Sequence, residues 1–139
     1  MCKILKMKYT HIKSVESLLN RNKQHLGSVE ISKNYKYWVV INNNNKVIGS
    51  IGFSDLENNV GMLISCVVSK ECRGKGIGNK LIKKAINYAK RQEYRKIILL
   101  TINPVMMILA IKCGFIPEGS LKRHFKNGED MCYFSYFIN

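Results

Sequence analysis

Residues Val67 to Lys80 have the sequence VVSKECRGKGIGNK, in which a β-branched apolar run passes through a glycine-rich loop into an amphipathic helix. The first four backbone amides of a helix have no partner inside the helix, and the three glycines between positions 74 and 78 would let several of them point at one spot. Arg73 and Lys75 add positive charge at the same place. The segment therefore predicts an anion-binding turn that suits a diphosphate.

The spacing of this loop excludes two other phosphate-binding loops. The Walker loop needs four residues between its first glycine and a Gly-Lys-Ser/Thr, and no Ser or Thr follows Gly74-Lys75. In the dinucleotide-binding fingerprint the third glycine comes later than Gly78 does here. On the loop alone, a glycine-rich turn that merely joins a strand to a helix remains the alternative.

Length and composition indicate one soluble globular domain. The chain has 139 residues, 46% of them hydrophobic, and a mean hydropathy of -0.12. No apolar run approaches the ~20 residues that span a bilayer, and lysines interrupt the apolar residues of Met1 to Lys6, where a signal peptide needs an unbroken core. We expect a cytoplasmic protein with no membrane partner.

The cysteines and histidines show no metal-binding spacing. Five cysteines form no Cys-x-x-Cys pair, and three histidines are scattered along the chain. We therefore expect no metal and mostly structural, reduced thiols. The cysteines are Cys2, Cys66, Cys72, Cys113 and Cys132.

The net charge of +14 comes from 23 Lys and Arg against 9 Asp and Glu. Such an excess attracts polyanions, so a nucleic acid or the ribosome is a conceivable partner. No arginine-rich or aromatic-interleaved patch accompanies the charge, and a bias in the base composition of the gene would also produce many lysines. We favour this second explanation over a specific nucleic-acid partner.

Hydrophobic periodicity predicts an alternation of strands and helices. Strands are predicted over residues 3–9, 35–41, 46–53, 62–68, 96–102, 115–118, 123–124 and 131–137, and helices over residues 12–19, 77–91 and 105–112, with a short helix or loop over residues 20–33. Asn103 is predicted as the N-cap of a helix opened by Pro104 and ended by Gly114. Gly49 and Gly52 indicate a bulge or a close backbone approach in their strand.

The pattern Arg-x-x-Gly-x-Gly in Arg73, Gly76 and Gly78 resembles the coenzyme A pyrophosphate loop of the GNAT superfamily of N-acetyltransferases. The predicted order of elements is also similar to that of the superfamily. The resemblance implies an α/β (α+β) GNAT fold with a mixed central sheet of about six to seven strands, in which an antiparallel N-terminal meander is followed by a parallel splayed pair, and about four helices. It further implies that residues 1–139 form a single acetyltransferase domain with acetyl-CoA as cosubstrate.

The same resemblance implies which residues bind the cofactor. The fourth strand would hold the pantetheine arm and offer an amide to the thioester oxygen, and the glycine loop would hold the pyrophosphate. Cys66, Val67 and Val68 are the implied arm residues, and Arg73, Gly74, Lys75, Gly76, Ile77, Gly78 and Asn79 are the implied pyrophosphate residues, with Asn103 as a further cofactor-binding residue.

A second segment matches the superfamily only in part. Asn103, Leu109 and Gly114-Phe115 agree with its usual pattern, whereas Met106 and Ala110 depart from it. The residue at the place of Ala110 is usually a tyrosine that protonates the departing thiolate, so the catalytic residues stay unknown. Other polar candidates are Glu57 as a base, and Glu118, His124, Asp130 and Tyr133 of the terminal hairpin, for each of which a solvated or hydrogen-bonded structural role is the alternative.

The segment from Cys113 to Arg123 resembles the branch of ribosomal-protein N-terminal and amino-sugar acetyltransferases. We therefore predict acetyl transfer from acetyl-CoA to a primary amine of a protein N-terminus, an amino sugar or another small molecule, by direct attack. The alternatives are a catalytically weak or inactive coenzyme A-binding module and a basic ribosome- or RNA-associated protein on the same fold. The oligomeric state is left open between monomer and homodimer.

Overall fold

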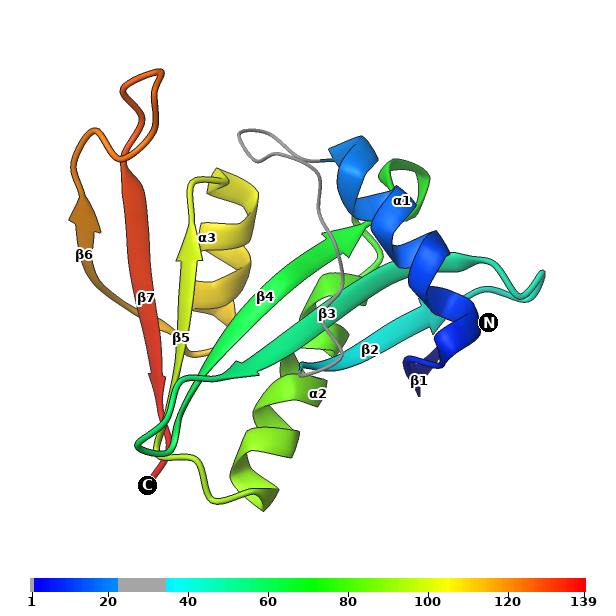
Figure 1. Ribbon diagram of the computed structural model, residues 1–139, viewed down its shortest axis with the longest axis horizontal. Coiled ribbons are helices and arrows are strands. Elements are labelled where there is room, and N and C mark those ends of the chain that lie inside the picture. The colour runs from blue at the N-terminus through cyan, green and yellow to red at the C-terminus, as the bar shows by residue number, and fades with distance from the viewer. Residues whose placement is uncertain (1, 23–34) are drawn as a thin grey trace. The chain divides into compact units, whose positions relative to one another are not determined.

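The computed structural model describes residues 2–22 and 35–139, and its strands form one sheet of seven in the order β1-β2-β3-β4-β5-β7-β6 (Figure 1). The strands are β1 (Lys3–Lys6), β2 (Lys36–Ile41), β3 (Val47–Asp55), β4 (Val60–Val68), β5 (Lys96–Thr101), β6 (Ile116–Leu121) and β7 (Met131–Phe137). The helices are α1 (Ile12–Asn22), α2 (Ile77–Arg91) and α3 (Pro104–Lys112), and the short 3-10 turns are η1 (Tyr9–His11) and η2 (Lys70–Cys72).

The sheet is mixed, as predicted. β1 pairs with β2 and β2 with β3 in antiparallel register, β4 pairs with β5 in parallel, and β7 is antiparallel to both β5 and β6. Three α-helices occur in the described residues, against about four expected. Most of the predicted short helix or loop over residues 20–33 lies outside the described residues. Its first residues belong to α1, which ends at Asn22 rather than at residue 19.

Two predicted strands differ from the structure. The first strand ends at Lys6, and Tyr9 begins a 3-10 turn. The strand predicted over residues 123–124 is wrong, because Arg123 has a φ of 52° and its amide donates to the Asp130 carboxylate at 2.8 Å. A side chain that captures a backbone amide in this way replaces the ladder bond of a strand.

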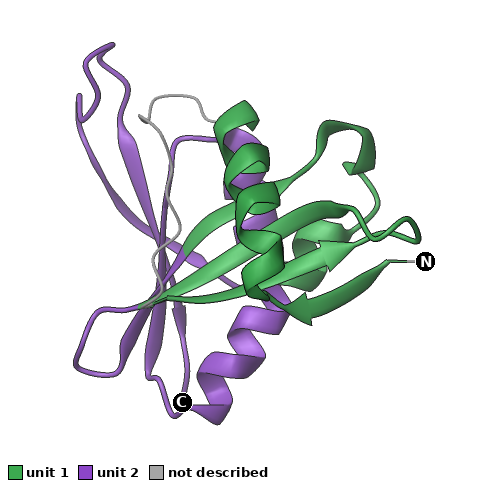
Figure 2. Cartoon of the chain, turned by 45° about the vertical axis from the view of Figure 1, so that its right-hand side comes forward, with its two compact units in different colours: residues 1–54, 64–81 green, residues 55–63, 82–139 purple. Residues whose placement is uncertain are grey.

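The chain divides into two compact units (Figure 2). Unit 1 comprises residues 1–54 and 64–81, and unit 2 comprises residues 55–63 and 82–139. β4 and α2 therefore contribute residues to both units. In the described part of the chain, no helix is both long enough and apolar enough to cross a membrane.

The core of unit 1 lies between α1 and the strands. The apolar residues of α1 recur at helical spacing, so that one face of the helix can be buried against the sheet. The buried residues of this cluster are Val15, Leu18 and Leu19 of α1 and Val39, Ile41, Val47 and Val67 of the strands.

Both glycines of β3 mark close approaches, as the sequence indicated. A Cβ atom on Gly49 would lie 3.1 Å from the carbonyl oxygen of Val67 and 3.5 Å from Leu81 of α2. A Cβ atom on Gly52 would lie only 2.5 Å from Cε1 of Tyr37 and 2.7 Å from Cγ1 of Ile64. Each glycine thus leaves room for a neighbouring side chain or backbone that a larger residue would displace.

In unit 2, the ends of α3 match the predicted caps. The Asn103 side-chain oxygen accepts a hydrogen bond from the Val105 amide at 2.9 Å. At the other end Gly114 has a φ of 100° and donates to the Ile111 carbonyl, while Phe115 donates to the carbonyl of Ala110. These two bonds form a Schellman motif, which satisfies carbonyls that the helix leaves without partners.

Candidate functional site

The first part of the candidate site is a bend in β4. Ser65 has a φ of 54°, a left-handed conformation that is rare for a residue other than glycine. Its carbonyl accepts a hydrogen bond from the Ser50 hydroxyl of β3 at 3.2 Å. Because left-handed backbone interrupts the alternation of a strand, the bend redirects the segment Cys66–Val68 that follows it. A serine gives no sequence signal for this conformation, and sequence reasoning missed it.

The loop after β4 is tied to the sheet at its beginning. The Ser69 amide donates to the carbonyl of Ile48 in β3 at 2.8 Å, and the Cys72 amide donates to the Ser69 carbonyl at 3.0 Å. These bonds hold η2 beside the end of the strand. The position from which the glycine loop departs is therefore fixed by backbone contacts.

Arg73 fastens the loop to two elements of unit 1. Its Nε donates to the Val68 carbonyl at 3.0 Å, and its Nη2 donates to the Asn22 side-chain oxygen at 2.8 Å. Asn22 in turn donates to the Leu18 carbonyl at 2.7 Å. From the sequence, Arg73 was expected only to supply positive charge to a bound anion. The structure adds a second role, in which a guanidinium with several donors shapes the loop.

The glycines of the loop expose the beginning of α2. Gly74 and Gly76 have φ values of 77° and 78°, and a Cβ atom on either would meet no atom of residues 2–22 and 35–139 within 4 Å. The Lys80 amide donates to the Gly76 carbonyl at 3.1 Å, which closes the first helical turn. Residues 77–79 come before Lys80 in the helix, and their backbone amides donate to no acceptor among residues 2–22 and 35–139. Three backbone donors thus lie together beside two glycines that carry no side chain.

Positive charge dominates around these amides. Lys75 and Lys80 are exposed, and the sequence of α2 contains neither aspartate nor glutamate. The one carboxylate of the loop, Glu71, lies 4.0 Å from the Lys46 ammonium. A hydrogen bond from its own backbone amide, together with the charge of Lys46, lowers the pKa of Glu71 and keeps it ionised. The helix N-terminus and the lysines together favour an anionic ligand.

All the predicted cofactor-binding residues except Asn103 lie in unit 1, and they are consecutive in two short segments. Within the arm segment Val67 is buried, whereas Cys66 and Val68 are half-buried. Asn103 lies in unit 2, where its side chain caps α3. The cofactor roles of these residues remain predictions.

The position at which the resemblance implied a proton-donating tyrosine carries no polar group. Ala110 is 0% exposed and lies in the last turn of α3. Glu57 has a φ of 71° in the turn before β4, where its carbonyl accepts a hydrogen bond from the Val60 amide. Its suggested role as a base stays a prediction.

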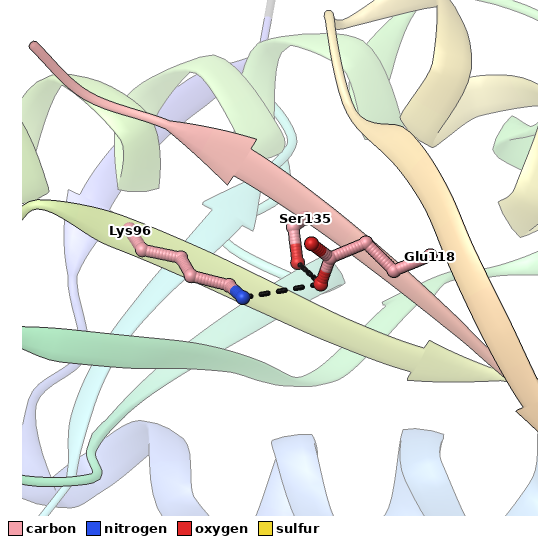
Figure 3. A network of polar contacts seen from close by, with 3 residues as sticks. All are labelled: Lys96, Glu118 and Ser135. Carbon is pink, nitrogen blue, oxygen red and sulfur yellow. Dashed lines mark hydrogen bonds and ion pairs between the residues drawn. The ribbon is translucent and has the colours of Figure 1, made fainter.

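The carboxylates of the terminal hairpin have structural partners. Glu118 accepts hydrogen bonds from the Ser135 hydroxyl at 2.6 Å and the Lys96 ammonium at 3.1 Å (Figure 3). Asp130 accepts from the Arg123 amide and from the Lys122 ammonium, which is 3.1 Å away. These contacts favour the structural alternative for both carboxylates.

The Glu118 cluster predicts a dependence of stability on pH. The Ser135 hydrogen bond, and then Lys96, lower the pKa of Glu118 below its ordinary value of 4.5. A lowered folded-state pKa stabilises the fold above pH 4.5, and this contribution is lost as the pH falls through the folded-state value. We expect Glu118→Gln to lower the melting temperature at neutral pH, with a difference from the wild type that shrinks on acidification.

The matched control is Glu93→Gln, which alters an exposed glutamate in the turn between α2 and β5. It should leave the melting temperature unchanged at every pH. A Glu118→Gln deficit of the same size at neutral and acidic pH would show that the ionised carboxylate contributes nothing.

Comparisons with known proteins agree with the fold described above. The model of the acetyltransferase (GNAT) family matches residues 2–115. Among curated proteins, none matches the chain by sequence. Among solved structures, the fold is similar to that of a phosphinothricin acetyltransferase from Sinorhizobium meliloti in complex with AcCoA, with a TM-score of 0.86 and 19% identity over 99% of this chain and 89% of that one.

Two further solved structures are similar over nearly their whole length. An N-acetyltransferase from Staphylococcus aureus Mu50 has a TM-score of 0.87 and 17% identity, and the match covers 100% of this chain and 99% of that one. A chain of the NatC complex bound to Gag peptide and CoA has a TM-score of 0.85 and 20% identity, with 99% of both chains covered. Because the family model matches residues 2–115 of this 139-residue chain, the protein belongs to the acetyltransferase (GNAT) family.

Proposed function

We propose that the protein is an acetyl-CoA-dependent N-acetyltransferase that transfers the acetyl group to a primary amine by direct attack. Residues 1–139 would act as one such domain, located in the cytoplasm. The proposal rests on membership of the family and on the loop between β4 and α2.

The observation that carries the proposal is the set of amides at the beginning of α2 that have no acceptor in the part of the chain that the structure describes. The donors of residues 77–79 lie beside two left-handed glycines without side chains, next to the cation of Lys75. A diphosphate accepts several hydrogen bonds at once and is attracted by the helix dipole. The complex of the similar Sinorhizobium meliloti enzyme with AcCoA supports the choice of ligand.

The bent end of β4 supplies the second part of the proposed site. Backbone groups of Cys66–Val68 would hold the pantetheine arm, and an amide there would face the thioester oxygen. Attack by an amine places negative charge on that oxygen. A preorganised donor at such a point lowers the barrier by about 2.7 to 4 kcal/mol in comparable oxyanion sites.

For the acetyl acceptor we propose a chemical class, a primary amine, and not a particular compound. We place the protein nearest the branch of ribosomal-protein N-terminal and amino-sugar acetyltransferases. The peptide bound in the similar NatC complex is in keeping with a protein N-terminus as acceptor. The net charge of +14 disfavours a polyamine and favours an acceptor that carries or adjoins negative charge.

A coenzyme A-binding module without catalysis is the second candidate. The observation that favours it is the buried Ala110, which has no proton to give to a leaving thiolate. Such a module would bind acetyl-CoA as tightly as an enzyme does, but it would not consume it.

Calorimetry and thiol release separate these candidates. We expect saturable heat on titration with acetyl-CoA, competition by 3′-dephospho-CoA, and thiol release that depends on one class within an amine panel. The control is acetyl-CoA with enzyme and no amine. Binding without thiol release for any amine would favour the binding module, and no binding at all would exclude both candidates.

A further inference from the structure

The exposed face of α2 carries positive charge and no negative charge. The opposite face of the helix is buried, with Ile82, Ala85 and Ala89 each 0% exposed. Every exposed side chain between residues 83 and 91 is a cation or an asparagine, and at 3.6 residues per turn these positions fall within an arc of about 120°. We call this surface the basic face of α2, and its residues are Lys83, Lys84, Asn87, Lys90 and Arg91.

No carboxylate neutralises the basic face. The sequence of α2 contains neither aspartate nor glutamate, and none of the ion pairs within the described residues involves a cation of this face. The Lys90 ammonium lies 5.6 Å from the centroid of the Tyr136 ring, a cation–π contact that leaves its charge in place. A helix face that only keeps a protein in solution usually mixes both signs of charge, because Glu and Lys one turn apart stabilise a helix. The basic face has no such compensation.

The helix dipole accounts for only part of this charge. Lys90 and Arg91 lie in the last turn, where cations stabilise a helix. Lys83 and Lys84 lie near its middle, and the exposed Lys80 comes three and four positions before them, so that like charges are neighbours on the helix. Such neighbours destabilise a helix, and a bound polyanion would remove their repulsion.

The residue types of the basic face suit the phosphate backbone of a nucleic acid. Lys, Arg and Asn are among the side chains that contact phosphate oxygens. From residue 83 to residue 91 the helix rises about 12 Å, and a DNA duplex presents about seven phosphate charges over that length. The basic face contains no aromatic side chain on which bases could stack, so its contacts would be to the backbone alone.

Two other acidic partners suit this face less well. An anionic membrane holds an amphipathic helix through apolar side chains as well as cations, and the apolar side chains of α2 are buried in the protein. Interfaces between proteins are depleted in lysine and enriched in aromatic residues, which is the opposite of this composition. The observations therefore favour a nucleic acid.

We propose that the basic face of α2 binds the phosphate backbone of a duplex nucleic acid without reading its base sequence. The four cations would displace counterions from the backbone, so the affinity falls steeply as the salt concentration rises. The inference does not depend on the proposed function, because none of the four cations is among the residues assigned to acetyl-CoA.

The experiment measures binding of the full chain to a short labelled duplex of mixed sequence, as DNA and as RNA, by fluorescence anisotropy. With four phosphate contacts, the wild type should bind at least about 10²-fold more weakly at about 200 mM salt than at about 50 mM. The test variant replaces all four cations by glutamine, as Lys83→Gln, Lys84→Gln, Lys90→Gln and Arg91→Gln. Its plot of log affinity against log salt should be shallower than that of the wild type by about 3.6.

The matched control replaces four exposed lysines outside α2 by glutamine. Both variants remove four positive charges, so the field of the whole protein decreases equally in each. The control should keep the salt dependence of the wild type. Equal losses in the two variants would overturn the assignment to α2, because position would then have no influence. The control substitutions are Lys3→Gln, Lys6→Gln, Lys13→Gln and Lys36→Gln.

Single substitutions separate binding from stability. Glutamine has nearly the helix propensity of lysine and arginine, so the melting temperature of each variant should stay close to that of the wild type. Lys83→Gln alone should reduce the steepness of the salt dependence by about 0.9, the contribution of one phosphate contact. An unchanged salt dependence for every single variant would contradict contact between this face and the backbone.

Three further results would overturn the inference. The wild type might bind neither duplex even at low salt. It could prefer one base sequence by about tenfold or more, as proteins with base contacts do. Or it could bind phosphatidylserine vesicles through the basic face and ignore both duplexes. Failure to bind acetyl-CoA, in contrast, would contradict the proposed function and leave this inference standing.

Discussion

Gly76→Asp is expected to weaken acetyl-CoA binding about a thousandfold, which corresponds to about 4.1 kcal/mol. Gly76 has a φ of 78° and lies immediately before the amides of residues 77–79, which donate to no acceptor within the described residues. A carboxylate at this helix N-terminus would accept hydrogen bonds from those amides itself, as N-cap aspartates do. It would also repel the diphosphate. Calorimetric titration of acetyl-CoA measures the dissociation constant directly.

The control for this variant is Gly76→Asn. Asparagine has the same shape as aspartate and tolerates the left-handed conformation, but it has no charge. We expect it to bind acetyl-CoA at least tenfold more tightly than Gly76→Asp, in keeping with the strength of hydrogen bonds to charged groups. Equal affinities for Gly76→Asp and the wild type would contradict the assignment of the diphosphate to this loop.

Gly52→Ala is expected to destabilise the fold by about 1–3 kcal/mol, the usual cost of overpacking a buried site. The new methyl group would lie 2.5 Å from the Tyr37 ring and 2.7 Å from Ile64, so one of them must move. Without the clash, replacing a glycine in extended backbone by alanine stabilises a protein by about 0.4–1 kcal/mol. Urea denaturation measures the unfolding free energy. A decrease in it would therefore show that the Tyr37 ring lies against position 52, and an increase would show that it does not.

The control is Gly49→Ala in the same strand, where the nearest atom would be 3.1 Å away. It should cost less than Gly52→Ala. The cost of Gly52→Ala should also shrink in a Tyr37→Ala background, because the ring is then absent. An unchanged or increased stability of Gly52→Ala in the wild type would mean that the ring does not lie over β3 as described.

Local chemistry explains which parts of the structure were predictable. The glycines of the loop, the Asn103 cap and the Gly114 helix end each depend on residues a few positions apart, so the sequence contains their signal. The bonds that tie the loop to Ile48 and Asn22 join residues distant in the chain and were not predictable in this way. The amphipathic pattern of α2 is likewise local, and its beginning at Ile77 agrees with the prediction. Of these features, the glycines of the loop and the beginning of α2 define the proposed diphosphate site.

Sequence reasoning missed two features that depend on distant contacts and one that depends on a local side-chain contact. Ser65 has no intrinsic preference for left-handed backbone, and its conformation is accompanied by a hydrogen bond from Ser50 of another strand. Gly52 signalled a close approach, but the sequence did not identify Tyr37 as its cause. The polar end of α1 shows no hydrophobic period, and there Asn22 donates to a carbonyl one turn back. Each of these contacts depends on three-dimensional or side-chain geometry that a periodicity does not contain.

The bond between Arg73 and Asn22 makes the end of α1 and the glycine loop thermodynamically linked. If ligand occupancy of the loop favours the conformation in which this bond is made, then ordering of the last turn of α1 must favour occupancy by the same free energy, since such coupling is reciprocal. If the loop binds the cofactor as proposed, then Asn22, fifty-one positions from Arg73 in the chain, would be a place at which cofactor affinity could be tuned without altering any residue of the loop itself.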